Sequence, residues 1–116
     1  MAKYSRTKYF IAEQRGSSWT IAANTVMTEA DINATGRSFA IINGAFTLTL
    51  PAASVFLKGV TVLVHGNNAN SKVAVAAGFG GGGASFDTVT VGAYNTVEFW
   101  CDGSQWYALS EAVGAS

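Results

Sequence analysis

From Ser38 onward, apolar residues alternate with small or polar ones, which is the period of half-buried β-strands. We expect strands at residues 39–42, 46–50, 60–64, 73–75, 87–91, 97–101 and 104–109. The dipeptides Asn43-Gly44 and Asp102-Gly103 separate neighbouring strands. Both favour the type I′ turn of a hairpin, because these residue types tolerate positive φ. The pattern predicts a small antiparallel β-sandwich or barrel.

The last predicted hairpin has two distinct faces. A two-residue loop at Asp102-Gly103 pairs Phe99 with Trp106, and the face expected in the core carries Val97, Phe99, Cys101, Ser104, Trp106 and Ala108. The opposite face carries Glu98, Trp100, Gln105 and Tyr107. Two aromatic rings beside a carboxylate and an amide suit a protein interface better than open water. We therefore expect an oligomer or partner interface at Trp100 and Tyr107, with Trp19 as a third aromatic.

Two short segments depart from the strand pattern. Residues 28–31 (TEAD) have the spacing of a capping box, so a single helical turn is expected there. Residues 78–83 satisfy the pattern G-x-G-x-x-G, which binds dinucleotides only where a helix follows. Because a strand pattern follows here, we interpret this glycine tract as a loop.

The charged residues are few and unevenly distributed. They make up 12% of the chain, and seven Lys and Arg balance seven Asp and Glu. Residues 1–15 carry a net charge of 4 − 1 = +3, and the rest of the chain carries a net charge of 3 − 6 = −3. We divide the chain into an extended basic N-terminal arm (1–16) and a single β domain (17–116). The arm is expected to dock on a neighbouring acidic surface through Lys3, Arg6, Lys8, Tyr9, Phe10 and Arg15; the alternative is a solvated, frayed chain end.

Candidate chemistry is sparse in this sequence. A formal net charge of zero gives no electrostatic reason to expect nucleic acid, and no apolar run reaches the about 18 residues of a membrane helix. The first 20 residues lack the apolar core of a secretion signal. With one cysteine and one histidine, we expect no metal site, no cofactor and no enzymatic activity. Cys101 is expected to be a small buried hydrophobe.

The low share of charged residues is itself informative. A domain of 116 residues exposes much of its chain, so the exterior must consist largely of Ala, Gly, Ser, Thr, Asn and aromatic residues. Monomeric proteins usually remain soluble through mixed surface charge. We therefore expect copies of this chain or another protein to cover much of the surface.

Three segments carry a resemblance to a known family. They are residues 47–54 (TLTLPAAS), 58–64 (KGVTVLV) and 97–106 (VEFWCDGSQW). In this order they resemble a small β-module of tailed-bacteriophage virion proteins. That module occurs in trimeric tail-fibre and tail-spike domains and in capsid decoration (cement) proteins. The resemblance covers roughly residues 38–110 and brings no catalytic site with it.

The module fills nearly the whole chain, so the resemblance favours a decoration protein over a long fibre. Such a protein would be made in the host cytoplasm and bind the major capsid protein on the virion surface as a homotrimer. There it would stabilise the head. The alternative is a tail-fibre or fibre-tip receptor-binding protein, in which Trp19, Trp100 and Tyr107 stack on host sugars. A lectin-like or enzymatic β-domain outside any virion is the third possibility.

Overall fold

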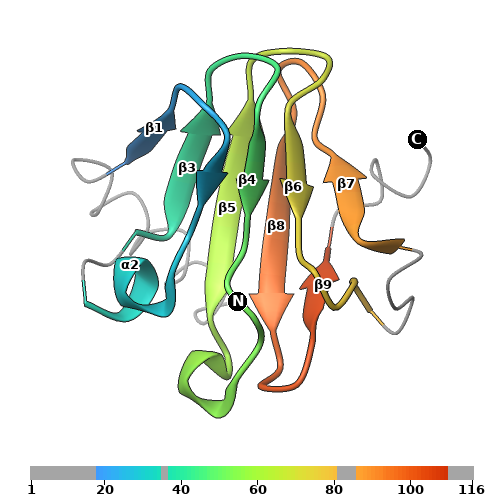
Figure 1. Cartoon of the computed structure of the whole chain (residues 1–116). Coiled ribbons are helices and arrows are strands. Elements are labelled where there is room, and N and C mark those ends of the chain that lie inside the picture. The colour runs from blue at the N-terminus through green and yellow to red at the C-terminus, as the bar shows by residue number, and fades with distance from the viewer. Residues whose placement is uncertain (1–17, 35–36, 81–85, 110–116) are drawn as a thin grey trace, which may run out of the picture.

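The computed structural model describes residues 18–34, 37–80 and 86–109, which form two sheets packed face to face (Figure 1). The five-stranded sheet has the order β1 (Trp19–Ile21), β3 (Phe39–Ile42), β5 (Thr61–Gly66), β8 (Thr96–Cys101) and β9 (Trp106–Ala108). The four-stranded sheet has the order β2 (Thr25–Val26), β4 (Thr47–Thr49), β6 (Lys72–Ala74) and β7 (Thr88–Thr90). The expected small all-β fold is confirmed.

The first six strands alternate between the two sheets, which corrects the expected antiparallel pairing. β1, β3 and β5 run parallel in one sheet, and β2, β4 and β6 run parallel in the other. Asn43-Gly44 therefore connects strands of different sheets, and the hairpin expected there is wrong. Antiparallel pairing holds for β5 with β8, β6 with β7, and β8 with β9. β1 and β2 lie before the region in which strands were expected.

Stacked turns at one end of the sandwich explain the parallel pairing. The backbone N–H of Asn43 donates to the carbonyl of Ile21 (2.9 Å), and that of Asn67 donates to the carbonyl of Ile42 (3.0 Å). The side chain of Asn24 accepts the first backbone N–H of β4 at 2.9 Å. The turns after β3 and β5 thus donate to the last carbonyl of the neighbouring parallel strand, and the turn after β1 accepts an N–H of β4, so these backbone groups do not lack partners.

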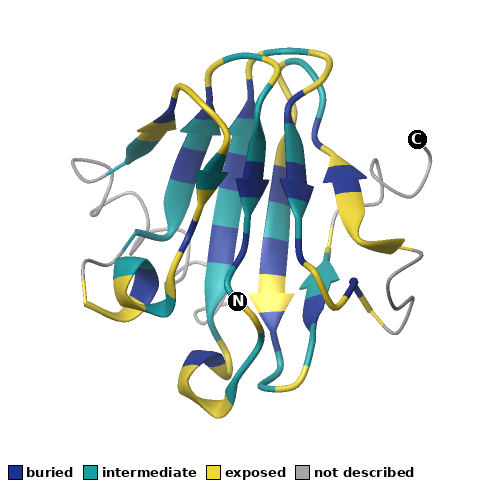
Figure 2. Cartoon of the chain, viewed as in Figure 1, coloured by how far each residue is buried: buried dark blue, intermediate teal, exposed yellow. Residues whose placement is uncertain are grey.

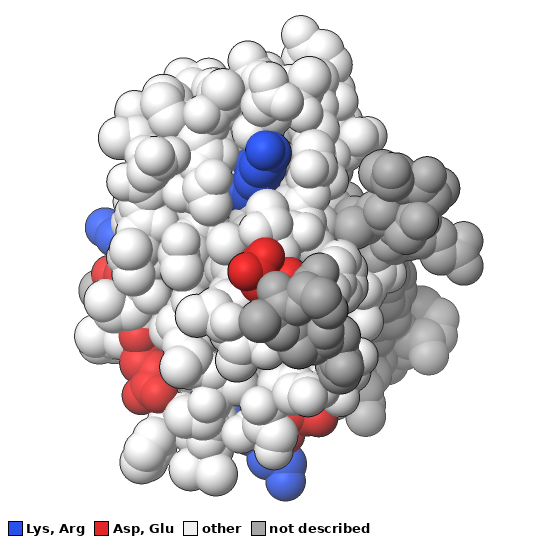
Figure 3. All heavy atoms as spheres, turned by 45° about the vertical axis from the view of Figure 1, so that its right-hand side comes forward, with Lys and Arg blue, Asp and Glu red and all other residues white. Residues whose placement is uncertain are grey.

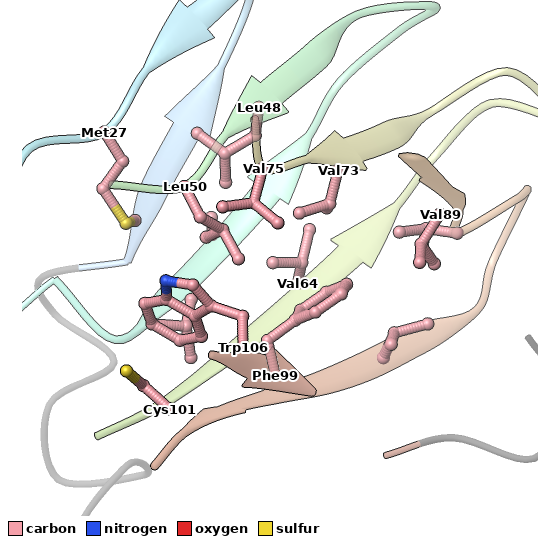
Figure 4. Close-up of a cluster of buried hydrophobic side chains, with 14 of the residues drawn as sticks. Met27, Leu48, Leu50, Val64, Val73, Val75, Val89, Phe99, Cys101 and Trp106 are labelled. Carbon is pink, nitrogen blue, oxygen red and sulfur yellow. The ribbon is translucent and has the colours of Figure 1, made fainter. Parts of the chain in front are cut away.

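The core lies between the sheets and receives side chains from both (Figure 4). Burial alternates along the central strands, as a sheet with one buried face requires (Figure 2). Trp106, Phe79 and Phe99 are the largest fully buried side chains. Phe79 belongs to the glycine tract, of which residues 81–83 lie outside the described part of the chain. Cys101 is fully buried, as expected.

The expected helical turn is confirmed as α2 (Glu29–Asn33). The hydroxyl of Thr28 accepts the N–H of Asp31 (3.2 Å), and the Asp31 carboxylate accepts the N–H of Thr28 (2.9 Å). Thr28→Ala removes the capping oxygen and should lower the free energy of unfolding by about 1 kcal/mol. Thr28→Ser keeps that oxygen, so its free energy of unfolding in denaturant titrations should be close to that of the parent protein. Equal losses for both variants would contradict this role of the cap.

Candidate interaction surface

The β8–β9 hairpin forms as expected, but its register differs by two residues. Cys101 pairs with Trp106 and Phe99 pairs with Ala108, where Ser104 and Trp106 were the expected partners. A shift of two residues leaves the strand residues on their predicted faces, because strand side chains alternate with a period of two. The two predicted faces are therefore confirmed for β8 and β9, but the core position expected for Ser104 is wrong, since Ser104 lies in the turn and is exposed.

Asp102 determines the wider turn between β8 and β9. Its Oδ1 accepts the backbone N–H groups of Ser104 (2.7 Å) and Gln105 (2.8 Å). Its Oδ2 accepts the hydroxyl of Tyr107 at 3.1 Å. The backbone bonds from Ser104 and Gln105, with a smaller effect of Tyr107, lower the pKa of Asp102. The same hydrogen bond raises the pKa of the Tyr107 hydroxyl and ties the tyrosine side chain to the turn.

This turn should loosen in acid. A carboxylate with a lowered pKa stabilises the fold above its ordinary value of 3.8, and that contribution is lost as the pH falls through the lowered value. The amide NMR signals of Ser104 and Gln105 should therefore titrate below pH 3.8. In Asp102→Asn these titrations should disappear, and the pKa of Tyr107 should fall toward its ordinary value. Unchanged titration of Tyr107 in the variant would contradict the assigned bond.

The outer face of the five-stranded sheet carries the Trp100–Tyr107 pair. We call it the outer sheet face; the strand register places on it Thr20, Phe39, Ile41, Thr61, Leu63, His65, Thr96, Glu98, Trp100 and Tyr107. Glu98 is the one acidic residue of these ten, and none is Lys or Arg. The rings of Trp100 and Tyr107 lie 5.7 Å apart with a tilt of 37°. Aromatic side chains with little charge around them are typical of the centre of a protein interface.

Trp19 lies apart from this aromatic pair. In the register it pairs with Ala40, which is fully buried, and its ring packs against the core. The guanidinium of Arg37 lies 4.3 Å from the centroid of the Trp19 ring. Arg37 also forms an ion pair with Asp31 at 3.5 Å. The structure therefore brings together two of the three expected interface aromatics, and places Trp19 on the inner side of edge strand β1.

The expected docking arm, with Lys3, Arg6, Lys8, Tyr9, Phe10 and Arg15, lies outside the described residues. The sequence analysis missed Phe39, Ile41 and Leu63 as surface residues, because parallel pairing was needed to align them on one face. It also missed the positioning role of Asp102. The available signal was the order Asp-Gly-Ser-Gln, since aspartate often accepts backbone N–H groups two residues ahead.

A metal-binding cluster and a membrane-spanning helix are both absent from the described residues. Among them, no three His, Cys, Asp or Glu side chains are grouped so as to hold a metal ion. Within the same residues, no helix has the length and apolar character needed to cross a membrane. Nδ1 of His65 lies 2.8 Å from the hydroxyl of Thr96, so this ring takes part in a cross-strand hydrogen bond.

No protein-family model matches the chain, and no curated protein is similar to it in sequence. Among solved structures, the chain is similar to the crystal structure of StcE(132-251) from enterohemorrhagic E. coli. The two are 18% identical, with a TM-score of 0.42, and the match covers 77% of this chain and 91% of that one. A likeness of this degree carries no argument about function.

Proposed function

We propose that this chain is a structural protein of a tailed-bacteriophage virion, a decoration protein that stabilises the capsid by burying protein surface. The observation that carries the proposal is the outer sheet face, with its Trp100–Tyr107 pair and single charged side chain. Contact with other proteins is the use that best explains such a face. Its partners are the major capsid protein and further copies of the chain, as a homotrimer on the capsid surface.

The rest of the described surface supports the same proposal. Charged side chains are sparse on the side seen in Figure 3, where most of the surface belongs to uncharged residues. Large apolar side chains are exposed elsewhere too: Val26 (68%), Val55 (74%), Phe56 (73%) and Tyr94 (81%). In a decoration protein each copy adds the free energy of its contacts, and many copies together oppose expansion of the head.

Replacing the aromatic pair tests this proposal. The double variant Trp100→Ala/Tyr107→Ala removes two central side chains of the outer sheet face. A pair of this kind contributes about 2 kcal/mol or more to binding, so affinity for capsids should fall about 30-fold. The matched control is Thr88→Ala/Thr90→Ala, on the exposed outer side of β7, which should bind capsids like the parent.

Binding is measured as occupancy of purified undecorated capsids over a range of protein concentrations. Circular dichroism of each variant confirms that the fold is kept. Parental occupancy by the folded Trp100→Ala/Tyr107→Ala variant would contradict the proposal.

A fibre-tip protein that binds host sugars is the second candidate. It is favoured by the partial exposure of Trp100 and by the neighbouring Asp102, because sugars stack on aromatic rings and donate hydrogen bonds to carboxylates. A glycan array separates the candidates. Specific binding that is lost in Trp100→Ala/Tyr107→Ala would support the fibre tip, and absence of sugar binding would favour the decoration protein.

A further inference from the structure

The outer sheet face is large enough to bind an extended segment of chain. Its five strands are spaced by about 4.8 Å and its longest strands have six residues, so it measures roughly 24 by 20 Å. That is a flat area of about 500 Å², which an extended segment can cross. The dimensions of the face therefore suit an extended segment as its occupant.

The charge of the outer sheet face indicates which kind of segment would bind there. Glu98 forms no ion pair with any residue in the described part of the chain, and it lies beside Leu63 in the register. Packing this face against the same face of a second copy would cover two such carboxylates, and neither face offers a Lys or Arg to pair with them. A segment with both basic and apolar side chains would pair with Glu98 and cover the aromatic residues.

Residues 1–17 of this chain have that composition. They combine a net charge of +3 with the apolar run Tyr9-Phe10-Ile11. In extended conformation about seven residues span the width of the face, so the segment is long enough to cross it. The described chain begins at Ser18, directly before β1, which is an edge strand of this same sheet.

We propose that the outer sheet face of one copy binds the basic N-terminal segment of a second copy. This inference rests on the proposed function, in which copies assemble, and it assigns the segment to a neighbouring copy instead of the capsid protein. Each copy then donates one segment and accepts one, which is a head-to-tail contact. Such contacts form a ring when the rotation between copies closes, and a ring of three copies is the expected homotrimer. A segment bound to its own chain would cover the face but leave the protein monomeric.

Photo-crosslinking in the full chain tests this assignment. Phe10 is replaced by benzoylphenylalanine in an isotopically light chain, which is refolded together with an isotopically heavy chain of parental sequence. After illumination, mass spectrometry should identify light–heavy crosslinks from position 10 to peptides of β3, β5 or β8. Crosslinks within light chains only, when heavy chains are in excess, would show binding to the same chain and overturn the proposal. Crosslinks to other surfaces, or none, would also overturn it.

Charge variants of the heavy chain check the chemistry of the contact. Glu98→Lys should lower the yield of light–heavy crosslinks about tenfold, and Glu98→Gln should lower it less. Asp87→Lys, a substitution directly before β7 of the other sheet, is the control and should leave the yield unchanged.

Failure of this inference is separable from failure of the proposed function. If crosslinks fail while Trp100→Ala/Tyr107→Ala still weakens capsid binding, only the assignment of the segment is wrong.

Discussion

Trp106→Ala is expected to lower the free energy of unfolding by about 3–5 kcal/mol. Trp106 has an exposed fraction of 0% and is the largest fully buried side chain. Its indole N–H donates to the carbonyl of Pro51 at 2.8 Å, which ties β9 to the segment after β4. The substitution leaves a large cavity and also a carbonyl without its donor. For a domain with an ordinary stability of about 5–15 kcal/mol, this loss leaves a large share of the chain unfolded.

Trp100→Ala is the matched control, because it makes the same chemical change six residues earlier in the same hairpin. Trp100 has an exposed fraction of 36% and lies on the outer sheet face, so its removal opens no cavity in the core. In denaturant titrations, Trp100→Ala should lower the free energy of unfolding by about 1 kcal/mol, mainly because the cross-strand contact with Tyr107 is lost. Similar losses for the two tryptophans would contradict the division between core and outer face.

Gly66→Ala is the second substitution with a large expected effect. A Cβ atom at Gly66 would lie near the backbone carbonyl of Gly92, too close for any real contact, and 2.9 Å from Cβ of Ser71. Neither atom can move freely, since one is backbone and the other belongs to a fully buried residue. The turns after β5 and β7 must separate to admit the methyl group. We expect a loss of about 3 kcal/mol in the free energy of unfolding.

Gly59→Ala is the control for this prediction. Gly59 has a φ of +84°, and a Cβ there would meet nothing within 4 Å. Only the left-handed backbone conformation opposes the substitution, at a cost of about 1 kcal/mol. Urea titrations should therefore rank Gly66→Ala well below Gly59→Ala in stability. The reverse order would show that backbone conformation, and not the close approach of the turns, limits these positions.

The sequence predicts correctly those features whose deciding contacts lie within a few residues of one another. The capping box at residues 28–31 and the two faces of the β8–β9 hairpin depend on spacings of two or three residues. Parallel pairing was not readable in this way. Asn43-Gly44 signals a reversal of the chain, but the same reversal serves a hairpin or a turn between two sheets. The choice depends on hydrogen bonds to turns about 20 residues away.

The candidate surface was only partly readable for the same reason. Trp100 and Tyr107 could be placed on one face because they belong to one hairpin. Phe39 and Leu63 join them only through parallel pairing of β3 with β5. The register of the hairpin itself depends on Asp102, whose carboxylate holds the turn open through two backbone bonds. An available sign of stacked turns was the recurrence of an asparagine after the parallel strands β1, β3 and β5, at Asn24, Asn43 and Asn67.

The copy number of this chain in purified particles is the most direct test of the central claim. Quantitative mass spectrometry would compare it with the major capsid protein. The proposed decoration role predicts many copies, in a simple ratio to the capsid protein. A few copies per particle would move the chain to the tail and make receptor binding the leading function. Absence from particles would contradict a virion role altogether.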